Sequence, residues 1–216
     1  MKCFIIAMQK EAQPLIEAMH DLTEKTVHGK KVYGGTLFGC PTHIVVCGIG
    51  KVNAACGAQY AISELKADEL VNIGVAGGLN DSVHIGEIYS IERAVQYDFD
   101  LAELNGTAIG TLDECKENYL PLFADSDFPA RRLATGDRFN DSTADYELLT
   151  GSLNADIRDM EGGAIAQVCM HAKVKFYSYK IISDLAKSGS TSEQYFKNLE
   201  LCFNSLRANL KKIVKL

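Results

Sequence analysis

Residues 159–186, DMEGGAIAQVCMHAKVKFYSYKIISDLA, decide the fold of this chain. The pattern of residues 174–182 is typical of a strand, because they are rich in aromatic and β-branched residues and contain no glycine or proline. The residues before them predict a helix with one buried stripe, made of Ala164, Ile165, Val168, Cys169 and Ala172. The stretch therefore predicts a helix and then a strand, with Glu161 at the helix start and Asp184 at the strand end.

These two carboxylates each have a functional and a structural explanation. Ligands of α/β folds bind beyond the carboxyl ends of strands, so Asp184 lies where ligand chemistry is expected. Glu161 reaches the same crevice only if the tertiary fold brings the helix start over it. However, the helix dipole favours an acidic residue in a first turn, and an aspartate after a strand often caps the next helix. The spacing alone favours the structural explanation for both residues.

Length and charge limit the class of protein. A chain of 216 residues fits one domain that can bury a full core. It has 22 basic and 28 acidic residues, a net charge of −6, so we expect no nucleic-acid partner. No apolar run approaches the roughly 20 residues of a membrane span, and no signal peptide is recognisable. We therefore expect a cytoplasmic protein without a membrane partner.

The cysteines and histidines do not predict a metal site. The 7 cysteines are scattered and mostly lie inside apolar patterns, which is typical of small core residues rather than disulfides. No CxxC or HExxH motif occurs among them and the 5 histidines. We expect neither a metal nor a cofactor.

The N-terminal segment predicts a strand at residues 2–7 and a helix after it, with Glu11 at the turn between them. Like Asp184, Glu11 is a carboxylate near the carboxyl end of a strand. A first-turn glutamate beside the helix dipole is an equally good explanation from this segment alone. Residues 32–38 and 43–47 then predict a hairpin, joined by the turn Gly39-Cys40-Pro41.

The second hairpin strand runs into Gly48-Ile49-Gly50-Lys51. A Walker phosphate loop needs GxxxxGK[ST], and Lys51 is followed by Val52, so the motif fails. A glycine-rich turn still lets the backbone approach a ligand closely, and tight packing is the alternative. The helix that follows has a predicted buried stripe at Val52, Ala55, Cys56, Ile62 and Leu65.

The middle of the chain is less regular. Residues 70–74 predict a strand that enters VAGGLN, where two glycines indicate a tight turn or a ligand contact. Residues 83–95 predict further strand structure, and 98–130 a variable insertion near the mouth of the site. A short strand at 133–135 leads into Gly136-Asp137-Arg138-Phe139-Asn140.

The C-terminal segment predicts a long helix that starts with a capping box at Thr191-Ser192-Glu193-Gln194. Its predicted buried positions are Tyr195, Phe196, Leu199, Cys202, Phe203, Leu206, Leu210 and Ile213. Strands and helices alternate along the chain without a linker or a repeat, so we expect one α/β domain over residues 1–216 with a mixed central sheet. No GxGxxG follows the first strand, which argues against a Rossmann dinucleotide fold.

Six segments together resemble the nucleoside phosphorylase superfamily, and in particular its hydrolytic branch, the 5′-methylthioadenosine/S-adenosylhomocysteine nucleosidases. The segments are FIIAMQKEA, CGIGKVNAA, VNIGVAGGL, ATGDRFND, DMEGGAIAQVC and KIISDLA. The resemblance covers nearly the whole chain outside 98–130. It implies a three-layer phosphorylase/hydrolase-like fold, with a mixed central sheet flanked by helices.

The resemblance also implies roles for individual residues. Asp184 matches the residue that protonates or hydrogen-bonds N7 of the purine, Glu11 the residue that deprotonates the water, and Glu161 the residue that holds the ribose hydroxyls. The other positions expected to bind substrate are Met8, Ile49, Phe139, Asn140, Met160 and Ser183. The implied partner is a small-molecule purine nucleoside, a 5′-modified adenosine such as methylthioadenosine or S-adenosylhomocysteine that loses adenine. A homodimer is implied as well.

Several positions depart from the family pattern. Phosphorylases carry an Arg and a Ser where this chain has Asn72 and Val75, so water is the expected nucleophile. The nucleosidases have an apolar residue at Asn140 and an Arg at Lys180. They also have an aromatic residue near positions 192–193, for which the sequence shows no clear equivalent. Two alternatives stay open: a phosphorylase whose cation is Arg93, Arg131 or Arg138, and a protein that binds a nucleoside without turnover.

Overall fold

The computed structural model of this chain describes residues 1–215, whose strands form one ten-stranded mixed sheet. The strand order is β10-β6-β8-β9-β5-β1-β4-β3-β2, with β7 paired to β6 and β10 also paired to β5. At the centre of this sheet, β1 pairs in parallel with β4 and β5, and β5 pairs in parallel with β10. The carboxyl ends of β1, β5 and β10 therefore meet at one edge.

The N-terminal half of the chain contains β1 (Lys2–Ile6), α1 (Gln9–Ala18), β2 (Met19–Val27), β3 (Lys30–Leu37), β4 (Cys40–Val46), α2 (Lys51–Ser63), β5 (Glu69–Gly78) and β6 (Ile88–Gln96). The C-terminal half contains α3 (Ala102–Asn105), β7 (Leu120–Pro121), β8 (Ala130–Thr135), α4 (Thr143–Glu147), the π-helical turn η1 (Leu148–Ser152), β9 (Ile157–Asp159), α5 (Gly162–Ala172), β10 (Lys175–Leu185) and α6 (Thr191–Val214).

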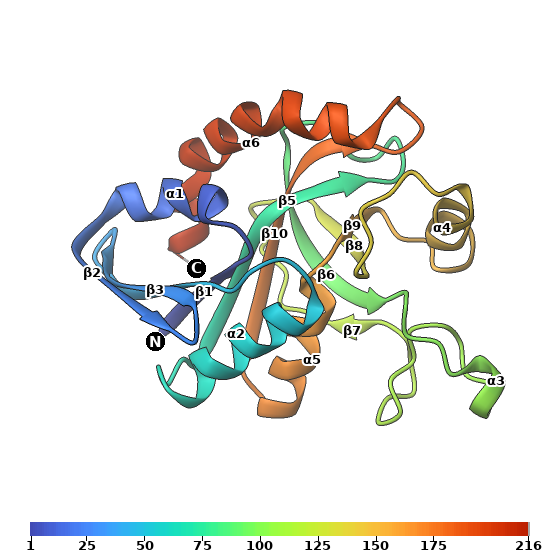
Figure 1. Cartoon of the computed structure of the whole chain (residues 1–216), viewed down its shortest axis with the longest axis horizontal. Helices are drawn as coiled ribbons and strands as arrows, with labels where there is room; N and C mark the ends of the chain where they lie inside the picture. Colours follow the sequence, from blue (N-terminus) through green and yellow to red (C-terminus); the bar gives the residue numbers. More distant parts are fainter. Residues whose placement is uncertain (216) are drawn as a thin grey trace.

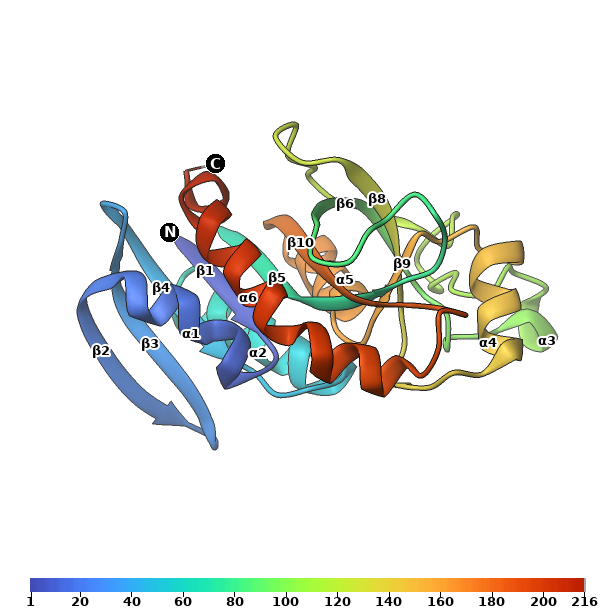
Figure 2. The ribbon, with the colours of Figure 1, turned by 90° about the horizontal axis from the view of Figure 1, so that it is seen from above.

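The helices cover the sheet on both sides (Figure 1). On one face, α2 packs against α5, and their buried residues join one hydrophobic cluster with the sheet. On the other face, α1 packs against α6, and a second cluster lies beneath them. Seen from above, α6 runs obliquely over the strands (Figure 2). The mixed central sheet flanked by helices is as the sequence predicts.

Four of the elements, β2, β9, α4 and η1, are not predicted from the sequence. β2 is an edge strand of mostly exposed polar residues, MHDLTEKTV, and forms only because it pairs with β3. A sequence without apolar alternation gives no strand signal, since the stabilisation comes from the backbone ladder. The short strand β9 and the helical turns α4 and η1 were missed because they lie in a stretch of turn-forming residues.

The buried stripe of α2 is not the predicted one. Its buried residues are Ala54, Gly57, Ala58 and Ala61, so small side chains face the sheet. Gly57 allows this close approach, because a Cβ there would lie 2.7 Å from Cβ of Cys47. Of the predicted stripe, Leu65 is buried and Ile62 packs against the core, whereas Val52 is 74% exposed and Cys56 is also exposed. Hydrophobicity alone therefore selected the wrong face at the start of this helix.

The start of α6 also differs from the prediction. Its N-cap is Ser190, whose hydroxyl accepts a hydrogen bond from the backbone N–H of Glu193, so the cap lies one residue before the predicted one. The buried face holds Cys202, Leu206, Leu210 and Ile213, as predicted. Phe196 was placed on that face and is instead 73% exposed. Within residues 1–215, no helix is both long and apolar enough to span a membrane.

Candidate active site

A cavity of about 410 Å³ lies where β1, β5 and β10 end. It is lined by Ala7, Met8, Glu11, Ile49, Val75, Ala76, Gly77, Arg138, Phe139, Arg158, Asp159, Met160, Glu161, Ser183, Asp184, Tyr195 and Phe196. All three carboxylates predicted from the sequence, Glu11, Glu161 and Asp184, are in this wall, although they are far apart along the chain. The condition set for Glu161, that the fold should bring the start of α5 over the strand ends, is met.

Glu11 is held by two backbone N–H groups. It occupies the first turn of α1 and is 3% exposed. Its Oε1 accepts a hydrogen bond from the N–H of Val75 (2.8 Å), and its Oε2 accepts one from the N–H of Met8 (3.1 Å). Burial raises the pKa of Glu11 to about 6, although both hydrogen bonds oppose the shift. The first-turn position that gave Glu11 a purely structural explanation also fixes its carboxylate in the cavity.

Asp184 lies beside an irregularity in β10. The register with β5 shifts between Ile182 and Asp184, and Asp184 then lies opposite Gly77. A Cβ on Gly77 would come within 2.8 Å of Oδ1 of Asp184, so a glycine is required for the carboxylate to pack there. Of the two alternatives for the glycine pair, the tight turn does not form, because both glycines continue β5, and Gly77 lies in the cavity wall.

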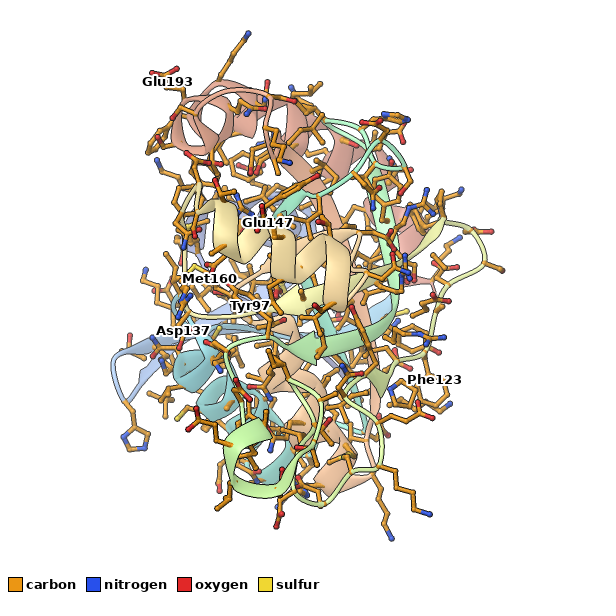
Figure 3. All side chains as sticks on the ribbon, turned by 90° about the vertical axis from the view of Figure 1, so that its right-hand side faces the viewer. Tyr97, Phe123, Asp137, Glu147, Met160 and Glu193 are labelled. Atoms are coloured by element: carbon orange, nitrogen blue, oxygen red, sulfur yellow. The ribbon has the colours of Figure 1, made fainter. Side chains whose placement is uncertain are left out.

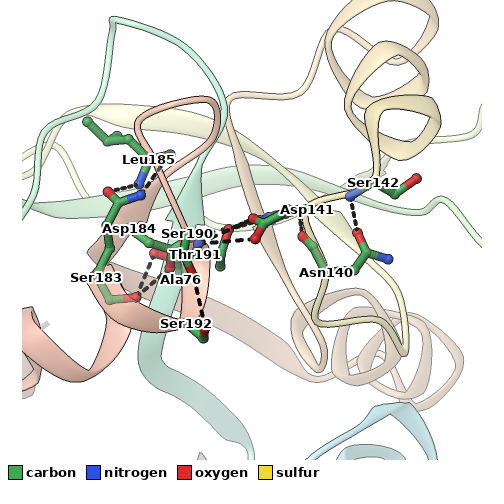
Figure 4. Close-up of polar contacts among 12 residues, drawn as sticks. Ala76, Asn140, Asp141, Ser142, Ser183, Asp184, Leu185, Ser190, Thr191 and Ser192 are labelled. Atoms are coloured by element: carbon green, nitrogen blue, oxygen red, sulfur yellow. Dashed lines mark hydrogen bonds and ion pairs between the residues drawn. The ribbon is translucent and has the colours of Figure 1, made fainter.

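The two oxygens of Asp184 have different surroundings. Oδ2 accepts a hydrogen bond from the Ser183 hydroxyl at 2.8 Å (Figure 4), whereas Oδ1 is buried without a hydrogen-bond partner among residues 1–215. Burial raises the pKa of Asp184, and the Ser183 hydrogen bond and the nearby Arg158 charge oppose this. A carboxyl group that retains its proton more readily, with one oxygen unused, is suited to donate a proton to a ligand.

Glu161 is the N-cap residue of α5. Its Oε1 accepts a hydrogen bond from the backbone N–H of Gly50 at 2.8 Å, so the glycine-rich turn before α2 positions this carboxylate. Gly50 has φ +97°, a conformation that favours glycine. Burial, followed by the negative charge of Asp159, raises the pKa of Glu161 to about 7. Lys51, the residue that suggested a phosphate loop, instead pairs with Asp98 at 2.5 Å.

A buried ion pair lies behind the carboxylates. Nζ of Lys180 is 2.7 Å from Oδ2 of Asp159, and each side chain is 1% exposed. Asp159 also accepts hydrogen bonds from the Thr135 hydroxyl (2.5 Å) and the Gly162 N–H (2.8 Å). Burial lowers the pKa of Lys180, but the charges of Asp159 and Glu161 outweigh burial, so the pKa is raised and the ammonium keeps its charge.

Arg158 lines the cavity and was not selected from the sequence. It is the middle residue of β9, an element the sequence did not reveal. Its Nη1 donates to the carbonyl of Asn140 (2.8 Å), and its Nη2 donates to the Thr191 hydroxyl (3.1 Å). The same Nη2 is 3.8 Å from Oδ1 of Asp184. The signal that the sequence offers for Arg158 is a basic residue two positions before Met160.

Aromatic rings form the outer part of the wall. Phe139 and Tyr195 meet edge to face with their centroids 5.7 Å apart, and Tyr195 meets Phe196 at 5.2 Å. Phe139 is 55% exposed. The aromatic residue that the sequence analysis did not find near positions 192–193 therefore has candidates in Tyr195 and Phe196. The missed signal was their adjacency, because neighbouring residues on a helix point about 100° apart, so one of the two rings lies at the edge of the buried stripe or outside it.

The cavity wall also contains Met8, Ile49, Phe139, Met160 and Ser183, which were all expected to bind substrate. Asn140 is outside this wall. Its side-chain amide donates to Asp145 at 2.9 Å, and its carbonyl is bound by Arg158. The contact between Asp141 and Thr191 ties the same loop to the start of α6 (Figure 4).

The expected insertion near the mouth of the site does not reach the cavity. Residues 98–130 contribute nothing to its wall, and the link is indirect, through Asp98, which accepts a hydrogen bond from the N–H of Asp137 at 3.0 Å. In the view onto α4, Met160 and Asp137 lie toward one side and Phe123 toward the other (Figure 3).

The part of the chain described here contains no group of three or more His, Cys, Asp or Glu residues that could hold a metal ion.

Comparison with known proteins gives consistent matches along the whole chain. The family model described as "Phosphorylase superfamily" matches residues 2–216. The 5′-methylthioadenosine/S-adenosylhomocysteine nucleosidase of Buchnera aphidicola subsp. Schizaphis graminum is 30% identical over 230 residues, covering 100% of this chain and 95% of that protein. The aminodeoxyfutalosine nucleosidase of Campylobacter jejuni is 30% identical over 224 residues, covering 97% of this chain and 95% of that protein.

A solved structure supports the fold. The 5′-methylthioadenosine/S-adenosylhomocysteine nucleosidase of Neisseria meningitidis, in complex with methylthio-immucillin-A, superposes with a TM-score of 0.89. The match covers 99% of this chain and 98% of that one, at 24% identity. The three-layer fold expected from the sequence resemblance is confirmed.

Proposed function

Because this chain belongs to the phosphorylase superfamily and is a nucleosidase, an N-ribosyl hydrolase, we propose that it hydrolyses the N-glycosidic bond of 5′-modified purine nucleosides. The observation that carries this proposal is the convergence of Glu11, Glu161 and Asp184 on one cavity. Methylthioadenosine and S-adenosylhomocysteine, which would release adenine, are the candidate substrates that the names of the relatives supply.

In the proposed reaction, the bond between C1′ and N9 breaks and its electron pair leaves with the purine. Asp184 donates a proton to N7, which makes the base a better leaving group. Glu11 takes a proton from a water molecule as the water oxygen bonds to C1′. Glu161 holds the ribose hydroxyls, and its negative charge favours the cationic ribosyl group of the transition state.

The surroundings of each carboxylate support its role. A pKa of about 6 leaves Glu11 ionised at neutral pH, as a base must be, yet close enough to neutrality to accept a proton. Burial favours the protonated form of Asp184, as an acid requires, and the unpartnered Oδ1 is the atom available to N7. The charge of Lys180 favours the ionised forms of both Glu11 and Glu161.

Water is the nucleophile that the cavity favours over phosphate. Val75 contributes an apolar side chain to the wall, and Asn72 is buried in the sheet, where its amide donates to the carbonyl of Ile5 at 2.9 Å. Of the three arginines considered for a phosphorylase, only Arg138 lines the cavity, and it is paired with Asp145 at 2.8 Å. A phosphate dianion would have to compete with that carboxylate for Arg138.

The open end of the cavity supports a substituent at the 5′ position. Phe139, Tyr195 and Phe196 offer an apolar aromatic surface there, which suits an alkylthio group better than a free hydroxyl.

We also propose that the chain forms a homodimer. Ile49 is 52% exposed and Val52 is 74% exposed, so an apolar surface lies beside the cavity, where a second copy would cover it. Light scattering coupled to gel filtration measures the oligomeric state directly.

The experiment that tests the activity is release of free purine from methylthioadenosine, S-adenosylhomocysteine, adenosine and inosine, with and without phosphate, followed by chromatography. We expect free base and free ribosyl sugar without phosphate. Strict dependence on phosphate with a ribose 1-phosphate product would instead establish a phosphorylase. Absence of release under both conditions would leave a protein that binds nucleosides without turnover. Asp184→Asn is the control that separates this site from a contaminating activity.

A further inference from the structure

We propose that Arg158 selects the base, so that purines with an oxygen at C6 are preferred over purines with an amino group there. The inference rests on the proposed function for the reaction and narrows the base that the site accepts. It departs from the adenine that the names of the methylthioadenosine nucleosidase relatives suggest.

The orientation of the purine follows from its own chemistry. N7 and the substituent at C6 lie next to each other on one edge of the ring system. In the orientation that we propose, Asp184 donates to N7 through its unpartnered Oδ1 and the C6 substituent faces the neighbouring group of the wall. That group is the Arg158 guanidinium, whose Nη2 is 3.8 Å from the same Oδ1.

The guanidinium can only donate hydrogen bonds at this place. Each terminal nitrogen carries two N–H groups, and one on each is used, by the Asn140 carbonyl at 2.8 Å and the Thr191 hydroxyl at 3.1 Å. The second N–H of Nη2 is too far from Asp184 for a hydrogen bond. An oxygen at C6 would accept from it, whereas an amino group would direct its own N–H groups at a cation.

The acceptors that an amino group would need are already engaged. The carbonyl of Asn140 accepts from Arg158, and Oδ2 of Asp184 accepts from Ser183 at 2.8 Å. Oδ1 is the oxygen that faces N7 in the proposed reaction. A 6-amino group would therefore have to share an acceptor that is already in use, and it would leave the second N–H of Arg158 Nη2 without an acceptor. A buried unpaired donor is strongly disfavoured.

The charge of Arg158 also fits the leaving group. Its proximity to Asp184 favours the ionised form of that carboxyl group and so works against proton donation to N7. A departing 6-oxopurine delocalises negative charge onto its C6 oxygen, where the guanidinium would stabilise it. Arg158 thus compensates, for an oxopurine alone, for the smaller fraction of Asp184 that carries a proton beside its charge. Its two hydrogen bonds hold it in place before substrate arrives.

The test compares kcat/KM for two pairs of nucleosides that differ only at C6, inosine with adenosine and 5′-methylthioinosine with 5′-methylthioadenosine. We expect the wild-type enzyme to prefer each oxo compound by about 10- to 100-fold, the range for one satisfied against one unpaired buried hydrogen bond. Arg158→Leu should bring both ratios close to one, and Arg158→Lys should retain part of the preference. A ratio is insensitive to the fraction of a variant that is folded. Equal or faster turnover of the amino compounds by the wild type would overturn the proposal.

A matched control and a binding measurement separate this inference from the proposed activity. Arg93→Leu removes an arginine that is outside the cavity and about half exposed, and should leave both ratios unchanged. Calorimetry with free hypoxanthine and free adenine reports base selection without turnover. Preferential binding of hypoxanthine that is lost in Arg158→Leu, in the absence of hydrolysis, would support Arg158 and refute the nucleosidase. Hydrolysis with no change of base preference in Arg158→Leu would support the nucleosidase and refute the role of Arg158. Binding of neither base would also overturn the inference.

Discussion

The two ends of the cavity are built in different ways. The carboxylate end consists of Glu11, Asp159 and Glu161, with Lys180 behind them. Its groups are at most 8% exposed, and each carboxylate accepts at least one backbone N–H. The aromatic rim consists of Phe139, Tyr195 and Phe196, of which Phe196 is 73% exposed. The rim is held mainly by ring contacts.

This difference separates chemistry from selection. Backbone N–H groups fix the carboxylates before substrate binds, as catalysis requires, because charge placed correctly in advance costs no reorganisation. Exposed rings can adjust to the group they cover, at the cost of weaker individual contacts. We therefore expect substitutions at the carboxylate end to affect turnover or stability strongly and substitutions at the aromatic rim to affect binding of one part of the substrate modestly.

The largest effect is expected for Glu11→Gln. An amide cannot take a proton from water, and loss of a general base costs about 10² to 10⁴ in rate. Turnover of the best purine nucleoside should fall by that factor, measured as purine release at pH 7.5, while circular dichroism stays like that of the wild type. Glu17→Gln, at an exposed position of the same helix, is the matched control and should be fully active. Activity of Glu11→Gln within threefold of the wild type would remove Glu11 from the mechanism.

The next effect is on stability, at the buried ion pair. Lys180→Met leaves the charge of Asp159 buried without its partner, a change that costs about 3–5 kcal/mol in unfolding free energy. Urea unfolding measures this loss of unfolding free energy. Lys31→Met breaks a pair of similar length, 2.8 Å to Glu24, in which both side chains are about half exposed, and should cost little. Similar losses in the two variants would show that burial does not distinguish these pairs.

The same division explains how much could be predicted from the sequence. Glu11, Glu161 and Asp184 each follow from a local rule, a helix start or a strand end, and the parallel arrangement of β1, β5 and β10 then brings their segments to one edge. Arg158 and Phe196 follow from no such rule. Arg158 lies on a three-residue strand that exists only through its pairing with β5 and β8, and Phe196 looks like a core residue until the turn of α6 is known. Local periodicity predicts what a segment is, but not which of its faces borders a cavity.

A third prediction uses pH. In the proposed mechanism the ionised form of Glu11 is the active one, and its pKa is raised to about 6, so kcat/KM should fall by at least tenfold per unit well below pH 6. Glu161, with a pKa raised to about 7, should add curvature between pH 6 and 7.5. The contribution of these groups to the unfolding free energy should change with pH in the opposite direction. The folded state holds these protons more tightly than the unfolded one, so their contribution is complete at pH 4 and is lost as pH rises through 6 to 7. Activity that persists unchanged at pH 5 would contradict the role of Glu11.

The smallest effect, and the sharpest test of the division, is expected for Phe196→Ala. The ring borders only the open end of the cavity, so its loss should raise KM for a 5′-alkylthio nucleoside by about five- to tenfold, the range for one aromatic contact. KM for the matching nucleoside with a free 5′ hydroxyl and kcat for both should stay within twofold. Phe123→Ala removes another exposed ring, 52% exposed, that is outside the cavity wall, and should change neither constant. If Phe196→Ala instead lowered kcat equally for both nucleosides, the aromatic rim would have to position the reacting atoms, and chemistry and selection would not be separate in this site.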